Sequence, residues 1–272
     1  MDIIFFSASL IFLSLATLHY LLFLVYRNPM VPRVARYSLY LTFASQLGYF
    51  LSRYFQGGMP FGTNMYESLV FFSWCLVTAY LIITMKYKVP VVGAFVMPIN
   101  LILMVAAALM PDKGIGEIPP ALQSNWLPIH VTLSFMGDAL FAMAFGSGVM
   151  YLIQERQLKR KRPGAFYYRL PSLDVLDSMN YRALTIGFPL LTLGIITGSV
   201  WAQYAWGSYW SWDAKETWSL ITWLIYAAVL HARLTAGWRG RKAAWFSIIG
   251  FAAVLFTFLG VNLLLSGLHS YN

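Results

Sequence analysis

Long apolar runs dominate this sequence, and they limit the chain to a fold that a lipid bilayer can surround. Of the 272 residues, 59% are hydrophobic and only 11% are charged. A hydrocarbon core about 30 Å thick takes about 20 helical residues to cross. Eight runs reach that length, at residues 3–25, 37–56, 65–85, 89–110, 129–153, 183–203, 216–234 and 244–266. Because backbone in lipid must satisfy its own hydrogen bonds, we predict an all-α polytopic membrane protein, one transmembrane domain over 1–272.

Lysine and arginine collect in every second connection between these runs, counted from the first. Of the 19 basic residues, only Arg53, Lys113 and Lys215 fall in the other connections. Cytoplasmic connections of membrane proteins are enriched in Lys and Arg, so this bias predicts that both termini face outward. The first run follows Asp2 without a basic segment and exceeds a signal-peptide core in length, so we expect it to be retained as a helix.

The inner connection 154–182 holds the largest basic cluster, and the same bias makes it cytoplasmic. Within it, Ser172 is a candidate N-cap, and Leu173, Leu176 and Met179 recur at helical spacing. We interpret this stretch either as a short amphipathic helix on the inner surface or as a spacer.

Charge and cysteine content exclude two classes of function. The net charge of +9 resides in the connections, which is the pattern of a membrane protein, so nucleic-acid binding is not expected. Cys75 is the only cysteine. A disulfide within the chain and a Cys-x-x-Cys-His haem-attachment site are therefore both excluded.

Tryptophans gather in the outer loop 201–216 and just beyond it. Six of the ten tryptophans lie between positions 201 and 223. An aromatic belt would spread such rings over all helix ends, whereas clustered flat side chains around a turn suit a broad, flat ligand. The candidate ligand-binding residues are Trp201, Trp206, Tyr209, Trp210, Trp212, Asp213 and Trp218.

The predicted topology sorts the four histidines into two levels. His130 and His269 lie at the outer surface, on different helices, whereas His231 and His19 lie near the inner ends of their runs. Two imidazoles at one level can ligate the iron of a planar macrocycle from its two faces. His231, in apolar surroundings, is either a functional residue or a partner in a helix–helix hydrogen bond. His19 is either the second half of an inner site or a packing residue.

Two acidic residues inside the apolar runs also need partners. Asp138 follows His130 by eight residues and could orient that imidazole or pair with Lys215. Glu67 lies at the outer start of the third run, where a carboxylate favours the helix dipole. It is therefore either a helix-terminus residue or a site residue.

The sequence WGSYWSWDAKETWSLITWLIYAAVLHAR, residues 206–233, resembles the CcsA/ResC family, the WWD-domain haem-handling proteins of type II cytochrome c biogenesis. Residues 63–74, 126–145, 170–202 and 267–271 resemble other motifs of this family, so the resemblance covers most of the chain. Ala214 stands where other members have proline after the motif's aspartate. We expect this difference to be harmless at a helix start.

The resemblance implies a haem b site at the outer face, formed by the Trp-rich loop. By the same resemblance, His130 and His269 match the outer axial ligands, and His231 matches a transmembrane haem ligand. Its partner histidine would lie in a companion subunit, CcsB. The implied protein is a membrane subunit of cytochrome c synthase, part of a haem lyase complex in a bacterial cytoplasmic or thylakoid membrane. It would help move haem to the outer face and present it to apocytochrome c for thioether attachment at Cys-x-x-Cys-His.

Three alternatives remain from the residues alone. A haem-delivery protein of the CcmC type shares the Trp motif but is shorter. A proton-coupled transporter could use His231 and Asp138. A structural membrane subunit without a ligand would tolerate replacement of Trp210, Trp212 and Asp213.

Overall fold

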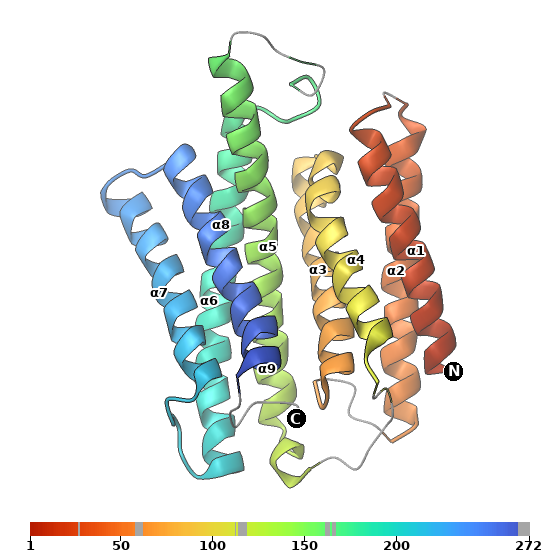
Figure 1. Cartoon of the computed structure of the whole chain (residues 1–272), viewed down its shortest axis with the longest axis vertical. Coiled ribbons are helices and arrows are strands. Elements are labelled where there is room, and N and C mark those ends of the chain that lie inside the picture. Colours follow the sequence, from red (N-terminus) through yellow and green to blue (C-terminus); the bar gives the residue numbers. More distant parts are fainter. Residues whose placement is uncertain are drawn as a thin grey trace. The chain divides into compact units, whose positions relative to one another are not determined.

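The computed structural model describes residues 1–26, 28–57, 62–111, 113, 119–160, 164 and 167–265. All regular secondary structure in these ranges is helical (Figure 1). The helices divide into two compact units, Met1–Ile118 and Pro119–Asn272. Each unit is described by itself below.

The first unit is a set of antiparallel helices in which successive helices run in alternating directions (Figure 1). Its elements are α1 (Asp2–Phe23), α2 (Met30–Phe55), α3 (Met65–Tyr87), the 3-10 turn η1 (Pro90–Val92) and α4 (Gly93–Leu109). α3 is the most buried, because α2 and α4 both pack against it. It begins at the N-cap Asn64, whose side chain accepts a hydrogen bond from the amide of Glu67 at 2.9 Å.

The second unit also alternates in direction from helix to helix (Figure 1). Its elements are η2 (Pro120–Leu122), α5 (Trp126–Lys159), α6 (Leu173–Trp206), α7 (Ala214–Thr235), α8 (Arg241–Leu255), the π-helical turn η3 (Phe256–Gly260) and α9 (Val261–Leu264). Asn180 ties three helices together at its core. Its amide donates to the carbonyl of Ala144 on α5 at 2.9 Å and to the hydroxyl of Ser247 on α8 at 2.8 Å.

Six helical segments of the described chain are long and apolar enough to cross a membrane. They are α1, α3, α5, α6, the segment Pro90–Leu109 and the segment Arg241–Gly260. The other two long helices, α2 and α7, have 26 and 22 residues, which also exceeds the length that a bilayer core requires. Their charged residues are Arg33, Arg36 and Arg53 in α2 and Lys215, Glu216 and Arg233 in α7. The predicted all-α polytopic membrane protein is confirmed.

The connection between α5 and α6 in the second unit is shorter than the range 154–182 that was predicted for it. α5 continues to Lys159 and α6 already begins at Leu173. Ser172 is confirmed as an N-cap, accepting from the amide of Val175 at 3.4 Å. The helix that it caps is not a separate surface helix, however, but the first part of α6. Its buried stripe of Leu176 and Met179 continues without a break into the apolar run, so one helix of 34 residues results.

Candidate functional site

The Trp-rich segment begins on a helix rather than in a loop. Trp201 and Trp206 occupy the last turns of α6, and Gly207 ends the helix in the left-handed conformation, at φ 74°. Glycine adopts this conformation without a steric penalty. Trp201 is 4% exposed, and its ring meets that of Trp206 edge to face, with the centroids 4.8 Å apart. The two indoles therefore form a fixed aromatic corner at the end of α6.

His130 lies against this corner from the first turns of α5. Its imidazole stacks on the indole of Trp201, with the ring centroids 6.0 Å apart and an interplanar angle of 15°. Its Nδ1 lies 2.7 Å from the carbonyl oxygen of Gly194 on α6. A carbonyl only accepts, so Nδ1 carries the proton in the neutral ring and Nε2 carries the lone pair. The carbonyl of Gly194 therefore orients the imidazole.

The segment between α6 and α7 is held by a reciprocal capping arrangement. Asp213 is the N-cap of α7, and its carboxylate accepts from the amide of Glu216 at 2.8 Å. The Glu216 carboxylate accepts from the amides of Ser211 at 2.7 Å and Asp213 at 3.3 Å. Ala214 is the first helical residue, a position that suits proline as well, because its amide needs no helical partner. The predicted ligand-binding residue Asp213 thus has a structural role in this motif.

Trp212 has an unusual backbone for a large side chain. Its φ is 60°, in the left-handed region, where a non-glycine residue costs of the order of 1–3 kcal/mol. Its ring meets that of Trp210 at right angles, with centroids 5.8 Å apart, and is 69% exposed. Tyr209 is also exposed. Because strained residues cluster at functional sites, Trp212 is a candidate site residue.

Trp218 lies on α7 and packs on the π-helical turn η3. Its ring centroid is 4.3 Å from that of Phe256. The predicted aromatic residues thus form at least three local groups: Trp201 with Trp206 and His130, Trp210 with Trp212, and Trp218 with Phe256. π-helical turns occur frequently at functional sites.

The other histidines have different surroundings. His231, predicted to lie in apolar surroundings, is exposed on α7 together with Ala228 and Leu224, one and two turns earlier on the same face. The described residues of the unit leave this face of α7 uncovered. The Nδ1 of His19 lies 2.8 Å from the carbonyl oxygen of Leu15, one turn back in α1, which fits a packing residue. His269 lies outside the described residues.

Asp138 and Lys215 interact electrostatically across the second unit, between α5 and the start of α7. This agrees with one of the two partners expected for Asp138. Sequence reasoning missed a second polar contact near the other end of α7. There Arg233 donates two hydrogen bonds to the carboxylate of Asp177 on α6, one of them at 2.9 Å, and the amide of Gly240 donates to the same carboxylate at 2.8 Å. An acidic residue within a basic connection was the only signal in the sequence.

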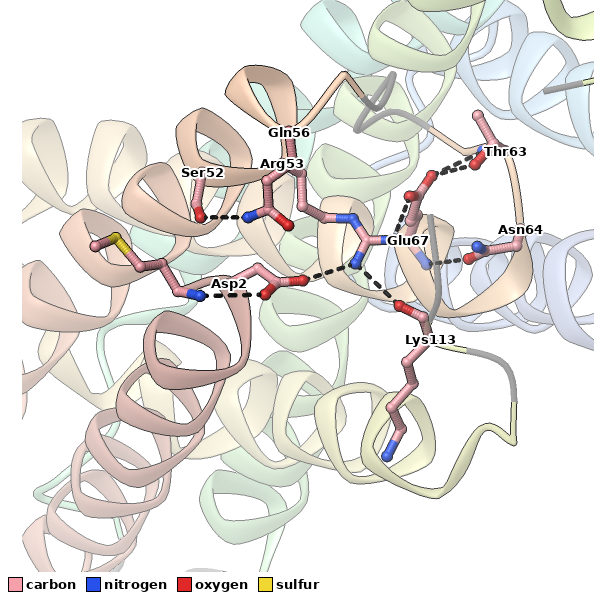
Figure 2. Close-up of polar contacts among 9 residues, drawn as sticks. Asp2, Ser52, Arg53, Gln56, Thr63, Asn64, Glu67 and Lys113 are labelled. Atoms are coloured by element: carbon pink, nitrogen blue, oxygen red, sulfur yellow. Dashed lines mark hydrogen bonds and ion pairs between the residues drawn. The ribbon is translucent and has the colours of Figure 1, made fainter. Parts of the chain in front are cut away.

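The first unit has its own buried polar cluster at the end where α3 begins (Figure 2). Arg53, at the end of α2, donates to the carboxylate of Glu67 at 2.8 Å and to that of Asp2 at 3.0 Å. It also donates to the backbone carbonyl of Lys113 at 3.0 Å. The second carboxylate oxygen of Glu67 accepts from the amide of Thr63 at 3.2 Å and from its hydroxyl.

Glu67 was expected to be a helix-terminus residue or a site residue. It is the central acceptor of this cluster, whereas the N-cap is Asn64. The cluster ties together the start of α1, the end of α2, the segment before α3 and the segment after α4.

Comparison with known proteins places the sequence among cytochrome c assembly proteins. The model of the family described as cytochrome C assembly protein matches residues 62–269. CcsA cytochrome c biogenesis proteins from Guillardia theta and Heterosigma akashiwo are 38% and 36% identical, over 81% and 98% of this chain and 79% and 94% of their own lengths. The CcsA protein of Chlamydomonas reinhardtii is 42% identical over 77% of this chain, which spans only 60% of that relative's length.

A solved structure shares the fold. The cytochrome c heme lyase CcmF superposes with a TM-score of 0.69 at 21% sequence identity. The superposition covers 95% of this chain and 46% of that one. At this identity, the similarity concerns the fold alone.

Proposed function

Because this chain belongs to the cytochrome c assembly protein family, and within it to the CcsA proteins, we propose that it is a membrane subunit of cytochrome c synthase. In this function it binds haem b, helps to move it to the outer face and presents it to apocytochrome c. The observation that carries the proposal is the imidazole of His130, stacked on Trp201 and held through Nδ1 by the carbonyl of Gly194.

The residues at this end of the second unit fit a haem group. A neutral histidine ligates haem iron through one ring nitrogen while the other donates to a backbone carbonyl. The hydrogen bond to Gly194 leaves Nε2 of His130 as the atom with the lone pair. Trp201 and Trp206 supply flat apolar surface next to it. His130 and His269 would hold the iron, and Tyr209, Trp210, Trp212 and Trp218 would contact the porphyrin.

Thioether formation requires no reactive group from the chain itself. Bound haem supplies two vinyl groups, and each takes up one cysteine S–H of the apocytochrome across its double bond, so the thioether forms without net oxidation. The chain needs no nucleophile of its own for this addition. Its residues hold the planar ligand, keep water from one side with the indoles of Trp201 and Trp206, and orient the exposed edge toward the peptide.

The inner end of α7 supports a second part of the proposal. An imidazole exposed to lipid is unfavourable, so the exposed His231 calls for a covering partner. A companion subunit of the CcsB type would cover this face and would supply the second ligand of a transmembrane haem. The complex would lie in a bacterial cytoplasmic or thylakoid membrane with the Trp-rich segment on the outer side, as the distribution of basic residues predicts.

A proton-coupled transporter that uses His231 and Asp138 is less well supported. Asp138 interacts with Lys215 near the start of α7, and His231 follows Lys215 by 16 residues. This separation corresponds to about 24 Å along a helix, too far for direct proton transfer between the two side chains. A haem-delivery protein of the CcmC type would be distinguished by its acceptor, a haem chaperone rather than an apocytochrome.

The test is haem content and ligation in protein that is purified together with the companion subunit. We expect a bis-histidine absorption spectrum, loss of most outer-site haem in His130→Ala, and its recovery on addition of imidazole. Trp245→Ala, which removes an exposed indole from α8, is the control and should retain haem. Normal haem content and normal cytochrome c maturation in His130→Ala would refute the proposal.

A further inference from the structure

The contact between α5 and α6 contains a ladder of close approaches that ends at His130. On α5 the facing residues are His130, Ser134 and Gly137, each about one turn from the next. On α6 they are Gly198, Gly194 and Gly187, in the opposite direction. The antiparallel helices thus meet through residues without bulky side chains on at least one side of each contact.

The glycines of this ladder differ in the atoms that an added Cβ would contact. A Cβ atom added at Gly137 would lie 3.0 Å from the amide nitrogen of Leu191 and 3.1 Å from the carbonyl oxygen of Gly187, which are backbone atoms. A Cβ atom added at Gly198 would lie 2.6 Å from both Cε1 and Nδ1 of the His130 ring. The imidazole therefore occupies the volume that any other side chain at position 198 would need.

This placement also accounts for the hydrogen bond of His130. With no side chain at position 198, the ring lies directly on the backbone of α6, which brings Nδ1 within 2.7 Å of the carbonyl of Gly194. Gly194 itself is required by Ser134, because a Cβ there would lie 2.5 Å from the Ser134 hydroxyl oxygen. Both glycines thus act on the same short stretch of α5.

We propose that Gly198 is a positioning residue for His130. Together with the carbonyl of Gly194, it sets the rotamer and the tautomer of the imidazole, and so specifies Nε2 as the atom that ligates an iron porphyrin. This inference rests on the proposed function for the identity of the ligand. The orientation of the ring, however, can be tested without any ligand.

If both glycines served only helix packing, alanine at either position would have the same kind of effect. The contacts at the two positions predict different effects. Alanine at position 137 meets backbone atoms at 3.0 and 3.1 Å, so the helices must shift by a few tenths of an ångström at a point two turns from the imidazole. Alanine at position 198 meets the His130 side chain, which can rotate. The imidazole therefore moves, and the spacing of the two helices stays the same. Gly137→Ala is therefore the matched control for Gly198→Ala.

The first experiment uses haem-free protein with ¹⁵N-labelled histidine. The chain has four histidines, and the His130 signal is assigned by its loss in His130→Gln. In the wild type and in Gly137→Ala we expect His130 as the Nδ1–H tautomer. In Gly198→Ala we expect that tautomer to be lost or mixed with Nε2–H. An Nε2–H tautomer in the wild type would overturn the inference without any substitution, and so would an unchanged His130 signal in Gly198→Ala.

The second experiment measures haem retention in the complex with the companion subunit. Loss of a group that orients a metal-ligating histidine weakens metal binding about 10- to 100-fold, and we expect this loss in Gly198→Ala. Gly137→Ala should lower the unfolding temperature but retain haem. A changed tautomer with unchanged haem affinity in Gly198→Ala would overturn the role of Gly198, whereas unchanged haem binding in His130→Ala would overturn the proposed function itself.

Discussion

The guanidinium of Arg53 lies 2.8 Å from the carboxylate of Glu67, and the two side chains are only 1% and 2% exposed. Removal of one partner from such a buried pair leaves an uncompensated charge and costs about 3–5 kcal/mol. We therefore expect Glu67→Gln and Arg53→Met each to destabilise the first unit by about this amount. Cys75, which is fully buried on α3, gives the measurement, because a thiol-reactive dye will label it only on unfolding.

Two further variants define the outcome for this pair. Gln56→Ala removes an exposed hydrogen bond at the same end of α2 and should leave the unfolding temperature almost unchanged. The double variant Arg53→Met, Glu67→Met should be less destabilised than the sum of the single changes, because neither member of the buried pair is left without the other. Additive losses would show that the two side chains do not act as a pair.

Two substitutions at the N-cap Asp213 distinguish the effect of its charge from the effect of its capping hydrogen bond. Asn caps helices about as well as Asp, whereas Ala at an N-cap costs about 0.5–2 kcal/mol. Asp213→Ala should therefore destabilise the start of α7 and weaken haem retention, and Asp213→Asn should retain most of both. Haem content and thermal unfolding of the two variants measure this. Equal loss of haem in both would instead indicate that the carboxylate charge acts on the ligand.

The left-handed backbone at Trp212 predicts that a substitution there will affect haem binding much more than the stability of the fold. Glycine at this position relieves the left-handed strain but adds freedom to the unfolded chain, which costs about 0.5–1 kcal/mol. We expect Trp212→Gly to unfold within a few degrees of the wild-type temperature and yet to lose haem. A strong drop in unfolding temperature would show that the indole stabilises the fold itself.

The exposed face of α7 predicts where the companion subunit binds. In a Cys75→Ala background, cysteines introduced at His231 and Leu224 should react readily with a small apolar maleimide in the isolated chain. In the complex their labelling should slow, because the partner covers this face. Ile196→Cys, on the exposed side of α6, serves as the control for general shielding by detergent. Equal labelling of all three positions with and without the partner would contradict the proposed interface.

Sequence patterns predicted the elements of the fold better than their mutual orientation. Apolar length indicates where membrane helices lie, and the N-cap at Ser172 was visible as a local signal. The exposure of His231 was not, because a membrane helix is apolar on its outer and inner faces alike and therefore lacks the amphipathic pattern of a soluble helix.

The polar contacts were missed for a related reason. The pairs of Arg53 with Glu67 and of Arg233 with Asp177 join separate helices. A single sequence holds no record of such contacts between distant residues. The tryptophans and His130 were predicted as ligand-binding residues because their side-chain types suit a flat, iron-bearing ligand. The glycines that orient His130 carry no such chemical signal.

The continuous α6 has a practical consequence for structure determination. Its first ten residues, 173–182, precede the apolar run and extend it by about 15 Å. These residues pack against the end of α5, so the two helices form a stiff antiparallel pair next to the connection between residues 160 and 172. A small rigid domain fused directly to the ends of the two helices, at Lys159 and Leu173, would keep a fixed orientation relative to them. It would serve as a fiducial marker outside the detergent micelle for particle alignment in electron cryomicroscopy.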